Sequence, residues 1–569
     1  MGKRQWEATP TSRSRPAPPQ GRESRWKPAF SYRTIGALSA PILSRRRMAV
    51  GTARGGDYPS ISFCVPFLLF TGARITMHRR HFLETTLGTA AAAMTIGRHA
   101  QAAASTDDIR VAQIGFRGQG RGHLEKLGKH IVALCDVDEK VLDKQGQQYK
   151  EKGQKVELFT DFRKLLQRKD IDAVSIATPN HTHALITVLA AQAGKDVYVE
   201  KPASHNIWEG RQMVAAAQRY GRIIQCGTQS RSSPALKQAA EFVQSGGLGA
   251  IRYAVGTCYK HRPSIGKSET AFQFPSHIHR DLWIGPAADE PFYRPARNSQ
   301  GGENPHYDWH WDYNTGNGDL GNQGIHQMDI ARWFLGEPNL APRTLSIGGR
   351  LGYDDAGNTA NTQITLHAYE KAPLVFEVRG LPRSASSGEM DRYRGSQIGV
   401  FVQCEKGYVV IPSYSEATAF DHEGRQVKHW QQGGDHHDNW LEAIAARDPQ
   451  KLNAEIEVGH RSSALCHTAN VSYRLGKKLP TPEIAERIAY DELLSVAFDR
   501  MLGHLRAHGV AVDGSEPVLT MGEWLTVDPA TESFVGNDAA NELRTRQYRQ
   551  PFEVPDIERE LATQAAAAS

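Results

Sequence analysis

Short apolar runs alternate with longer amphipathic or polar segments through the first part of this chain, as far as Gly227. The apolar runs predict strands at 109–115, 131–135, 173–177, 197–199 and 223–226. The segments between them predict helices at 120–129, 139–150, 162–168, 184–193 and 207–220, with Asp161 as a candidate N-cap. Strands and helices that alternate at this spacing form a doubly wound parallel sheet.

After Gly227 the pattern changes. Helices are predicted at 234–244, 324–335, 439–446 and 458–475, and strands at 252–258, 362–368, 374–378, 398–403 and 408–411. The alternating polarity of these strands is typical of an antiparallel sheet. A loop-like stretch at 259–317 is rich in aromatic and polar residues, and the tail from Glu516 is polar and weakly patterned. We therefore expect an α/β protein whose second domain is α+β, with a large, mostly antiparallel sheet.

Residues 77–104 have the three parts of a twin-arginine export signal in order. Arg79-Arg80 is followed by an alanine-rich apolar run at 85–97 and by small residues at 100–102. The alternative is an amphipathic helix that happens to carry two arginines. We expect export to the periplasm or another extracytoplasmic space. Residues 1–76 precede this signal, so either Met77 is the true start or the preface is a disordered extension.

Composition narrows the possible partners. The formal net charge is +6, but residues 1–76 hold thirteen Lys/Arg against three Asp/Glu, and the residues after 104 carry an acidic excess of six. We therefore expect no nucleic-acid partner. The apolar run of the leader is too short to span a membrane well, and we expect no span in the mature form. None of the six cysteines forms a Cys-x-x-Cys pair, so a zinc site is not expected, although one disulfide is possible.

A glycine-rich turn follows the first predicted strand. Gly115-Phe116-Arg117-Gly118-Gln119-Gly120 is an imperfect dinucleotide fingerprint with Arg117 where the second glycine should stand and Gly118 next to it. Asp136 ends the second strand, where a carboxylate binds ribose hydroxyls and repels a 2′-phosphate. These residues predict a nicotinamide cofactor, NAD rather than NADP. The alternative for Asp136 is a strand-terminal residue that caps a turn.

Two later turns carry further candidates for this site. Thr178, Asn180 and His183 lie after the strand at 173–177, where they either cap the next helix or approach the nicotinamide ribose. Glu200-Lys201-Pro202 ends the strand at 197–199. A lysine at the carboxyl end of a parallel strand, beside a cationic nicotinamide, should have a lowered pKa and exchange a proton with a substrate hydroxyl. An ordinary strand-end lysine is the alternative.

The third candidate segment is Gly321–Asp329. Asn322 and His326 are four residues apart and would share one face of a helix, where His326 acts on a substrate hydroxyl or fills the domain junction. The run 306–313 alternates His and Asp with aromatic residues, but no further ligand stands at metal-binding spacing, so we expect no metal. Aromatic rings among polar groups favour a sugar instead. The candidate sugar-binding residues are Tyr307, Trp309, Trp311, Tyr313 and His326.

Taken together, these motifs resemble those of the Gfo/Idh/MocA oxidoreductase family. The resemblance covers about 110–478 and includes the glycine turn, Cys135–Asp138, Ala177–Asn180, Glu200–Pro202, Asp281–Pro286 and Gly324-x-His326-x-x-Asp329. It implies an N-terminal Rossmann domain and a C-terminal α/β domain whose open sheet often forms an oligomer interface, hence a homo-oligomer, either a dimer or a tetramer.

The resemblance also implies a catalytic set, namely the Lys of Glu-Lys-Pro with an Asp and a His four residues apart. Lys201 and His326 match that pattern, and Glu200 precedes the lysine. Asn322 stands where the family has Asp. An amide cannot accept a proton, so Lys201 and His326 would act alone or with help from Asp319 or Asp329.

The sequence thus predicts domains at 105–230 (NAD-binding), 231–480 (substrate-binding and oligomerisation) and 481–569 (extension). We expect an NAD-dependent oxidoreductase that acts on a sugar, a cyclitol or a sugar derivative. Outside the cytoplasm no soluble NAD pool exists, so the cofactor should be tightly held. The alternatives are an NAD-retaining glycosidase or lyase that forms a transient keto-sugar, and a sugar-binding protein that kept the fold without catalysis.

Overall fold

The computed structural model describes residues 105–568. Its first part is built on a six-stranded parallel sheet with the order β3-β2-β1-β4-β5-β6. The chain order reverses between β1 and β4, and at such a point a doubly wound sheet binds its ligand beyond the carboxyl ends of the strands. The strands are β1 (Val111–Ile114), β2 (Ile131–Cys135), β3 (Glu157–Phe159), β4 (Ala173–Ile176), β5 (Asp196–Val199) and β6 (Ile224–Cys226).

Most of the helices between these strands begin at a residue whose side chain caps the helix. Asp138 accepts from Lys140 N at the start of α3, and Asp161 accepts from Arg163 N at the start of α4, as predicted. Gly221 ends α6 in the left-handed region, with a φ of 57°. The helices are α2 (Gly120–Lys126), α3 (Glu139–Glu151), α4 (Phe162–Leu166), α5 (Asn180–Gln192) and α6 (Ile207–Tyr220).

Two predictions for this domain were wrong. Helix α5 begins at Asn180, four residues earlier than expected, and no side chain caps it, so neither Thr178 nor Asn180 is a cap. The polar first turn is helical because it is buried, with His181 hydrogen-bonded to the carbonyl oxygens of Trp283 (2.9 Å) and Thr315 (3.1 Å). Strand β3 was missed because it is only three residues long and mostly exposed.

The second part holds a 12-stranded sheet with the order β14-β13-β12-β11-β7-β10-β9-β8-β16-β15, to which β17 and β18 attach through β8. Its pairs are antiparallel, except that β7 and β10 run parallel. The predicted mostly antiparallel sheet is therefore confirmed. The strands are β7 (Ile251–Tyr259), β8 (Arg343–Gly349), β9 (Thr362–His367), β10 (Leu374–Arg379), β11 (Ile398–Cys404), β12 (Gly407–Ile411), β13 (Glu416–Asp421), β14 (Gln426–Gln431), β15 (Lys477–Leu479), β16 (Leu519–Met521), β17 (Leu525–Asp528) and β18 (Ser533–Phe534).

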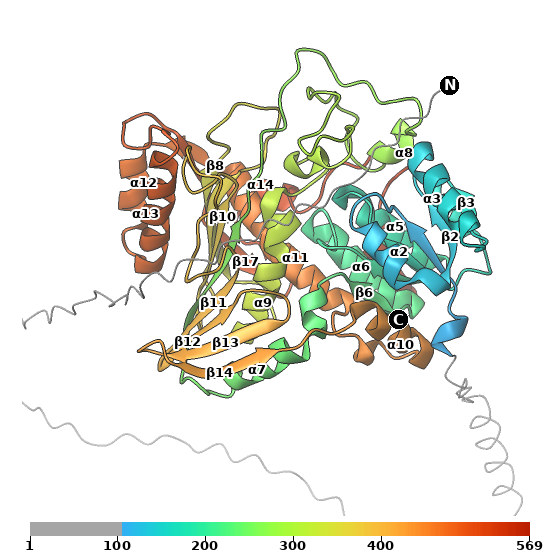
Figure 1. Cartoon of the computed structure of the whole chain (residues 1–569), viewed down its shortest axis with the longest axis horizontal. Coiled ribbons are helices and arrows are strands. Elements are labelled where there is room, and N and C mark those ends of the chain that lie inside the picture. Colours follow the sequence, from blue (N-terminus) through green and yellow to red (C-terminus); the bar gives the residue numbers. More distant parts are fainter. Residues whose placement is uncertain (1–104, 569) are drawn as a thin grey trace, which may run out of the picture. The chain divides into compact units, whose positions relative to one another are not determined.

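Helices cover the two faces of this sheet (Figure 1). On one face, α7 (Pro234–Gln244), α9 (Ile325–Leu335) and α11 (Ile456–Leu475) pack with the strands into the largest apolar cluster. On the other face, α12 (Thr481–Ile488) and α13 (Glu492–Arg506) pack against β8, β9 and β10 in a separate cluster. Helix α10 (His436–Ala446) instead packs its buried Trp440 against the first domain.

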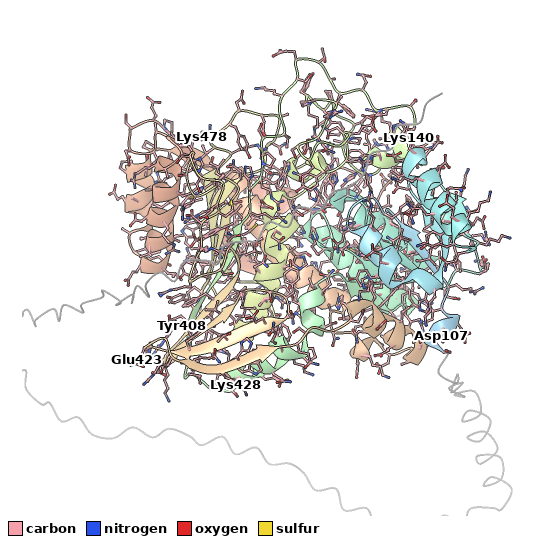
Figure 2. The ribbon with its side chains drawn as sticks, in the orientation of Figure 1. Asp107, Lys140, Tyr408, Glu423, Lys428 and Lys478 are labelled. Carbon is pink, nitrogen blue, oxygen red and sulfur yellow. The ribbon has the colours of Figure 1, made fainter. Side chains whose placement is uncertain are left out.

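The resemblance links an open face of this sheet to oligomer formation. Helices α12 and α13 cover part of one face, whereas the β12–β14 end of the sheet extends beyond them (Figure 1). Tyr408 of β12 and Lys428 of β14 mark that end, and Lys478 of β15 marks the opposite end (Figure 2). The oligomeric state stays a prediction.

The tail after Glu516 is more ordered than its weak pattern predicted. It adds β16, β17 and β18 to the second sheet and then forms α14 (Asp538–Glu542) and α15 (Ile557–Ala568). Phe552, Val554 and Ile557 are buried in the apolar cluster of the first domain. The tail therefore packs against both sheets.

Three further expectations concern cysteines, the membrane and the leader. Cys135, Cys226, Cys258, Cys404 and Cys466 are all buried free thiols, so the disulfide that the count allowed is not formed within 105–568. No helix in the same part of the chain is long and apolar enough to cross a bilayer. The extension at 1–76 and the expected signal at 77–104 lie outside the described residues.

Candidate functional site

The glycine turn after β1 has the close contacts that a nucleotide-binding turn needs. Gly115 has a φ of +74°, and a Cβ there would lie 2.9 Å from Ala177 O. A Cβ on Gly120 would lie only 2.2 Å from Gly115 O, whereas a Cβ on Gly118 would meet nothing within 4 Å. Gly115 and Gly120 thus permit the tight turn and the close approach of α2, and Gly118 leaves the open space that a pyrophosphate requires.

Asp136 stands at the carboxyl end of β2, beside this turn. Its carboxylate accepts hydrogen bonds from Phe116 N (3.3 Å) and Asp138 N (3.0 Å). Burial raises the pKa of Asp136, although both hydrogen bonds oppose that effect. A carboxylate has about four lone-pair positions, so two remain for ribose hydroxyls. The turn and Asp136 together fit the ribose and pyrophosphate of a dinucleotide.

Asp138 is a second carboxylate at this edge and was not singled out from the sequence. His277 Nδ1 and His306 Nε2 each lie 2.9 Å from its oxygens, and Arg117 NH1 lies 3.6 Å away. Burial favours the neutral form of Asp138, but the hydrogen bonds from His306 and His277 outweigh burial and lower the pKa of Asp138 to about 2. Arg117 therefore reaches toward Asp138, and the long 259–317 segment closes over the turn after β2.

The turn after β4 contacts both the Lys201 turn and the second domain. Both ring nitrogens of His183 lie 2.8 Å from carbonyl oxygens, Nδ1 from that of Pro202 and Nε2 from that of Thr178. His183 thus joins two turns of the first domain and has no ring nitrogen free. Asn180 Nδ2 donates to Asn317 Oδ1 at 3.0 Å, which ties the first turn of α5 to the end of the long segment.

Lys201 lies two residues after the end of β5 and is half-buried. Its Nζ donates a 2.8 Å hydrogen bond to the main-chain carbonyl of Asn322. Burial lowers the pKa of Lys201, and the nearby cations Lys260 and Arg262 lower it further, while Glu200 opposes them. The lysine that was predicted to exchange protons is therefore fixed in place and shifted toward its neutral form.

Glu200 lies in a buried polar chain behind Lys201. Its carboxylate lies 3.0 Å from His123 Nε2 and accepts from Gln229 Nε2 at 3.3 Å, and His123 Nδ1 lies 2.8 Å from Ser175 Oγ. Burial opposes ionisation, but the hydrogen bond and the charge of His123 lower the pKa of Glu200 to about 2. Glu200 thus stays ionised beside Lys201. His123 is 77 residues away in sequence, and nothing in the local pattern indicated it.

Asn322 lies in a π-helical turn, Leu320–Gly324, and α9 begins only at Ile325. The helix is continuous through this turn into α9, so Asn322 and His326 lie on one helix, as expected, with Asn322 in its π-helical turn. His326 is buried, and its Nδ1 has no hydrogen-bond partner among residues 105–568. Burial and the charge of Lys201 lower the pKa of His326 to about 3. The imidazole is neutral at neutral pH and has a nitrogen available for a ligand.

Asp319 and Asp329, the two acids expected to help Lys201 and His326, are both engaged by other residues. Asp319 forms a bidentate pair with Arg262, at 2.8 and 2.6 Å. Asp329 pairs with Arg231 (2.8 Å) and accepts from Ser462 Oγ at 2.6 Å. The negative charge of each carboxylate is therefore already balanced by an arginine.

The four aromatic candidates separate into two places. Arg262 donates to Tyr307 OH at 3.0 Å and lies over the Trp311 ring at 5.0 Å. Trp309 stacks on His310 at 3.6 Å, and burial followed by the charges of Lys201, Arg262 and Lys260 lowers the pKa of His310 to about 3. The Tyr307–Trp311 segment thus lies near Lys201.

Tyr313 does not join this group. It lines a polar cavity of about 410 Å³ with residues of α11 and of the tail, and neither Lys201 nor His326 lines that cavity. Among residues 105–568 no three or more His, Cys, Asp or Glu side chains are arranged to hold a metal ion.

Two family models match consecutive parts of the chain. The NAD-binding Rossmann fold of the oxidoreductase family GFO_IDH_MocA matches residues 109–228, and its C-terminal alpha/beta domain matches residues 237–507. The chain belongs to the Gfo/Idh/MocA oxidoreductase family.

Several curated proteins are similar to part of the chain. Levoglucosan dehydrogenase of Pseudarthrobacter phenanthrenivorans is 26% identical over 187 residues, 33% of this chain and 39% of that protein. D-apiose dehydrogenase of Paraburkholderia graminis is 32% identical over 249 residues, which cover 43% of this chain and 54% of that protein. Alpha-N-acetylgalactosaminidase of Shewanella oneidensis is 29% identical over 171 residues, which cover 25% of this chain and 37% of that protein. The matches thus span between about a third and a half of each relative.

Solved structures also align with part of the chain. A levoglucosan dehydrogenase in complex with NADH and levoglucosan is 18% identical, with a TM-score of 0.46 over 63% of this chain and 95% of that chain. The aldose-aldose oxidoreductase of Caulobacter crescentus is 19% identical, with a TM-score of 0.46 over 64% of this chain and 97% of that chain.

Asn322 stands where the resemblance to the family implies an Asp. The contact that Asn322 makes with Lys201 uses its main-chain carbonyl. That contact does not depend on whether the side chain is an amide or a carboxylate. The anchoring of the lysine is therefore compatible with the substitution, while a proton acceptor is lost.

Proposed function

We propose that this protein oxidises a CH–OH group of a sugar, a cyclitol or a sugar derivative, using an NAD that it retains. The observation that carries this proposal is the placement of Lys201. It follows β5 at the carboxyl edge of the parallel sheet, its Nζ is anchored on Asn322 O, and its pKa is lowered by burial and by neighbouring cations. A lysine in this position and state is suited to act as a general base.

Lys201 and His326 have different roles in the proposed reaction. NAD, when bound, would accept the hydride from the substrate carbon. A neutral lysine has two N–H groups and one lone pair, and the hydrogen bond to Asn322 O uses one N–H. The lone pair remains to take the proton of the substrate hydroxyl. His326, with a pKa of about 3, would hold a hydroxyl as a neutral imidazole and would not act as a cationic acid.

The cofactor is proposed to be NAD rather than NADP because of Asp136. Its carboxylate retains lone pairs for the ribose hydroxyls and would repel a 2′-phosphate. Asp136→Ser should remove that repulsion and improve the affinity for NADP relative to NAD by about tenfold or more. Calorimetric titration of the full chain with each nucleotide tests this preference. An unchanged ratio of the two affinities would contradict the role of Asp136.

Retention of the cofactor is supported by the long 259–317 segment. His277 O accepts from Glu139 N, and His279 N donates to Val137 O, each at 2.9 Å, beside the histidine contacts to Asp138. These contacts close over the turn after β2, where the adenosine ribose would lie. With the expected twin-arginine leader, these contacts support export of the protein with its cofactor inside. The reduced cofactor would then return to NAD within each cycle by passing its hydride to a second sugar or back to the same substrate.

Mass spectrometry of the nucleotide that co-purifies with the full chain tests the proposal most simply. NAD or NADH should be released on denaturation, and a panel containing levoglucosan, D-apiose and simple hexoses should change its redox state. A correctly folded protein that neither contains nor takes up a nicotinamide nucleotide would contradict the proposal. If Lys201→Ala left every activity unchanged, a non-catalytic sugar-binding role would replace it.

An NAD-retaining glycosidase is the second candidate. It is favoured by the similarity to the Shewanella alpha-N-acetylgalactosaminidase and by Asn322, which removes a proton acceptor from the usual set. In such a reaction oxidation of a sugar carbon acidifies the neighbouring C–H, and no net redox change results. Release of the aglycone from a nitrophenyl glycoside without added nucleotide would select this candidate. Accumulation of reduced cofactor with a free sugar would select the dehydrogenase.

A further inference from the structure

The π-helical turn Leu320–Gly324 carries the main-chain carbonyl that anchors Lys201. The turn packs closely against the second sheet, since a Cβ added to Gly324 would lie 2.9 Å from the ring of Phe376. Single π-helical turns inside α-helices are rare and occur frequently at functional sites. Because Asn322 lies in this turn, the contacts that hold the turn also set where the Lys201 ammonium lies.

Tyr414 contacts both this turn and the start of α9. It lies in the short connection 412–415 between β12 and β13. Its hydroxyl accepts a 2.7 Å hydrogen bond from Gln323 Nε2, and its ring lies 4.7 Å from the imidazole of His326, with the two planes inclined by 36°. One side chain thus touches the residue next to Asn322 and also the histidine of the proposed active site.

Tyr414 is itself held firmly. Its half-buried ring packs against the largest apolar cluster of the second domain. The strands on either side of it pair with each other, and the carbonyl of the next residue, Ser415, accepts from Gln432 N at 3.0 Å. Burial raises the pKa of Tyr414 to about 12, so the phenol is uncharged at neutral pH. A rigid ring with few rotatable bonds loses little entropy when it fixes a neighbouring group.

The imidazole of His326 has a particular need for such a neighbour. Its Nδ1 has no hydrogen-bond partner within residues 105–568, so that nitrogen does not fix the rotation of the ring. Aromatic rings in contact prefer definite orientations, and such pairs contribute beyond the area that they bury. The ring of Tyr414 therefore supplies orientation that a hydrogen bond to Nδ1 would otherwise give.

We infer that Tyr414 is a positioning residue for both groups of the proposed reaction. Its ring orients the imidazole of His326, and its hydroxyl holds Gln323 and thereby the π-helical turn on which Lys201 is anchored. This inference rests on the proposed function and adds the residue that coordinates its two acting side chains. Because ring and hydroxyl act on different groups, substitutions can separate them.

Competitive acetylation of the full chain with acetic anhydride, followed by mass spectrometry, measures how firmly Lys201 is held. Tyr414→Phe keeps the ring and removes the hydroxyl, and Lys201 should then react about fivefold faster relative to the other lysines, the effect of losing one hydrogen bond. Gln323→Met should give the same increase. The double variant should add nothing, since both changes remove one contact.

Tyr408→Phe is the matched control. Tyr408 is a half-buried tyrosine of the preceding strand whose ring stacks on Phe420 at 5.2 Å, toward the β12–β14 end of the sheet (Figure 2). Its loss of a hydroxyl should leave the acetylation of Lys201 unchanged. An unchanged rate in Tyr414→Phe, or an equal increase in Tyr408→Phe, would overturn the inference.

The contact with His326 is tested by NMR of the full chain with ¹³C-labelled histidine rings, in which His326→Gln identifies the signal. Tyr414→Leu removes the ring current of the phenol and should move that signal, whereas Tyr414→Phe should leave it close to its native position. The same signal position in Tyr414→Leu as in the native protein would overturn the role of the ring.

Kinetics separate the two contacts in the proposed reaction. Tyr414→Phe should lower kcat about fivefold and leave KM unchanged, because the anchoring of Lys201 loosens while His326 stays in place. Tyr414→Leu should also raise KM, because the imidazole that holds the substrate hydroxyl loses its neighbour. Levoglucosan and D-apiose are the probes, and a raised KM with unchanged kcat in Tyr414→Phe would contradict the inference. If no sugar reduces the cofactor, the proposed function fails, whereas acetylation and NMR still decide the inference.

Discussion

Lys201 Nζ and the main-chain carbonyl of Asn322 are joined by a 2.8 Å hydrogen bond. This contact connects the end of β5 in the first domain to a π-helical turn in the second, across 121 residues of sequence. It places the proposed base at the junction of the first and second domains. Because a main-chain atom makes it, the contact tolerates the change from the family Asp to Asn322.

The first prediction concerns the chemistry of Lys201. Lys201→Met should lower the rate of sugar oxidation by about a thousandfold, since it removes a general base worth 10² to 10⁴, while nucleotide content stays unchanged. Asn322→Ala is the control, because it retains the carbonyl and should cost far less. Single-turnover cofactor reduction in the full chain measures both. A similar loss in the two variants would contradict the specific role given to the Lys201 ammonium.

The pH dependence should report the lowered pKa of Lys201. Lysine must be neutral to accept a proton, so the oxidation rate should rise with pH through that lowered pKa and level off below the ordinary value of about 10.4. Asn322→Asp should place a carboxylate near Lys201, raise its pKa and move the midpoint to higher pH by about one unit. The measurement is the pH profile of single-turnover oxidation. A midpoint that moves to lower pH would contradict the electrostatics described for this site.

Nucleotide binding should depend sharply on one glycine of α2. Gly120→Ala would place a Cβ 2.2 Å from Gly115 O, a main-chain atom that cannot rotate away, so the turn must open. We expect nucleotide affinity to fall by about tenfold or more. Gly122→Ala lies in the same helix, where a Cβ would meet nothing within 4 Å, and it should bind normally. Equal affinities of the two variants, measured by calorimetry, would argue against a nucleotide in this turn.

Stability should depend on the tail. Phe552 is 1% exposed in the apolar cluster of the first domain, so Phe552→Ala should lower the free energy of unfolding by about 3 to 5 kcal/mol. Val535 lies in the same tail and is 59% exposed, and Val535→Ala should change stability by less than about 0.5 kcal/mol. Denaturant unfolding of the full chain compares them. A loss as small for Phe552→Ala as for Val535→Ala would show that the tail is not part of the folded core.

Much of the first domain followed from the sequence because its strands and helices have strong local patterns. The glycine turn, Asp136 and Lys201 were found because parallel strands bring their carboxyl ends to one edge. The Asn322 contact escaped prediction because it uses a main-chain carbonyl, which residue types do not indicate. His123 and His277 were missed because tertiary contacts over 77 and 139 residues bring them to Glu200 and Asp138.

The structure of the tail could not be predicted from the sequence for a different reason. Its strands are two to four residues long, too short to give a clear alternation. Strands β16 and β17 form by pairing with β8 on the side that β9 does not occupy. Phe552 looked like an isolated aromatic residue in a polar segment. Its burial depends on a surface of the first domain that exists only after the Rossmann sheet has formed.

Isotope transfer tests the central claim most directly. The NAD-loaded full chain would be mixed with a sugar deuterated at its ring carbons, quenched, and the nucleotide analysed by mass spectrometry. Deuterium should appear on the nicotinamide in the native protein and be nearly absent in Lys201→Met. Consumption of the sugar with no deuterium on the nucleotide, or equal transfer in Lys201→Met, would contradict the account.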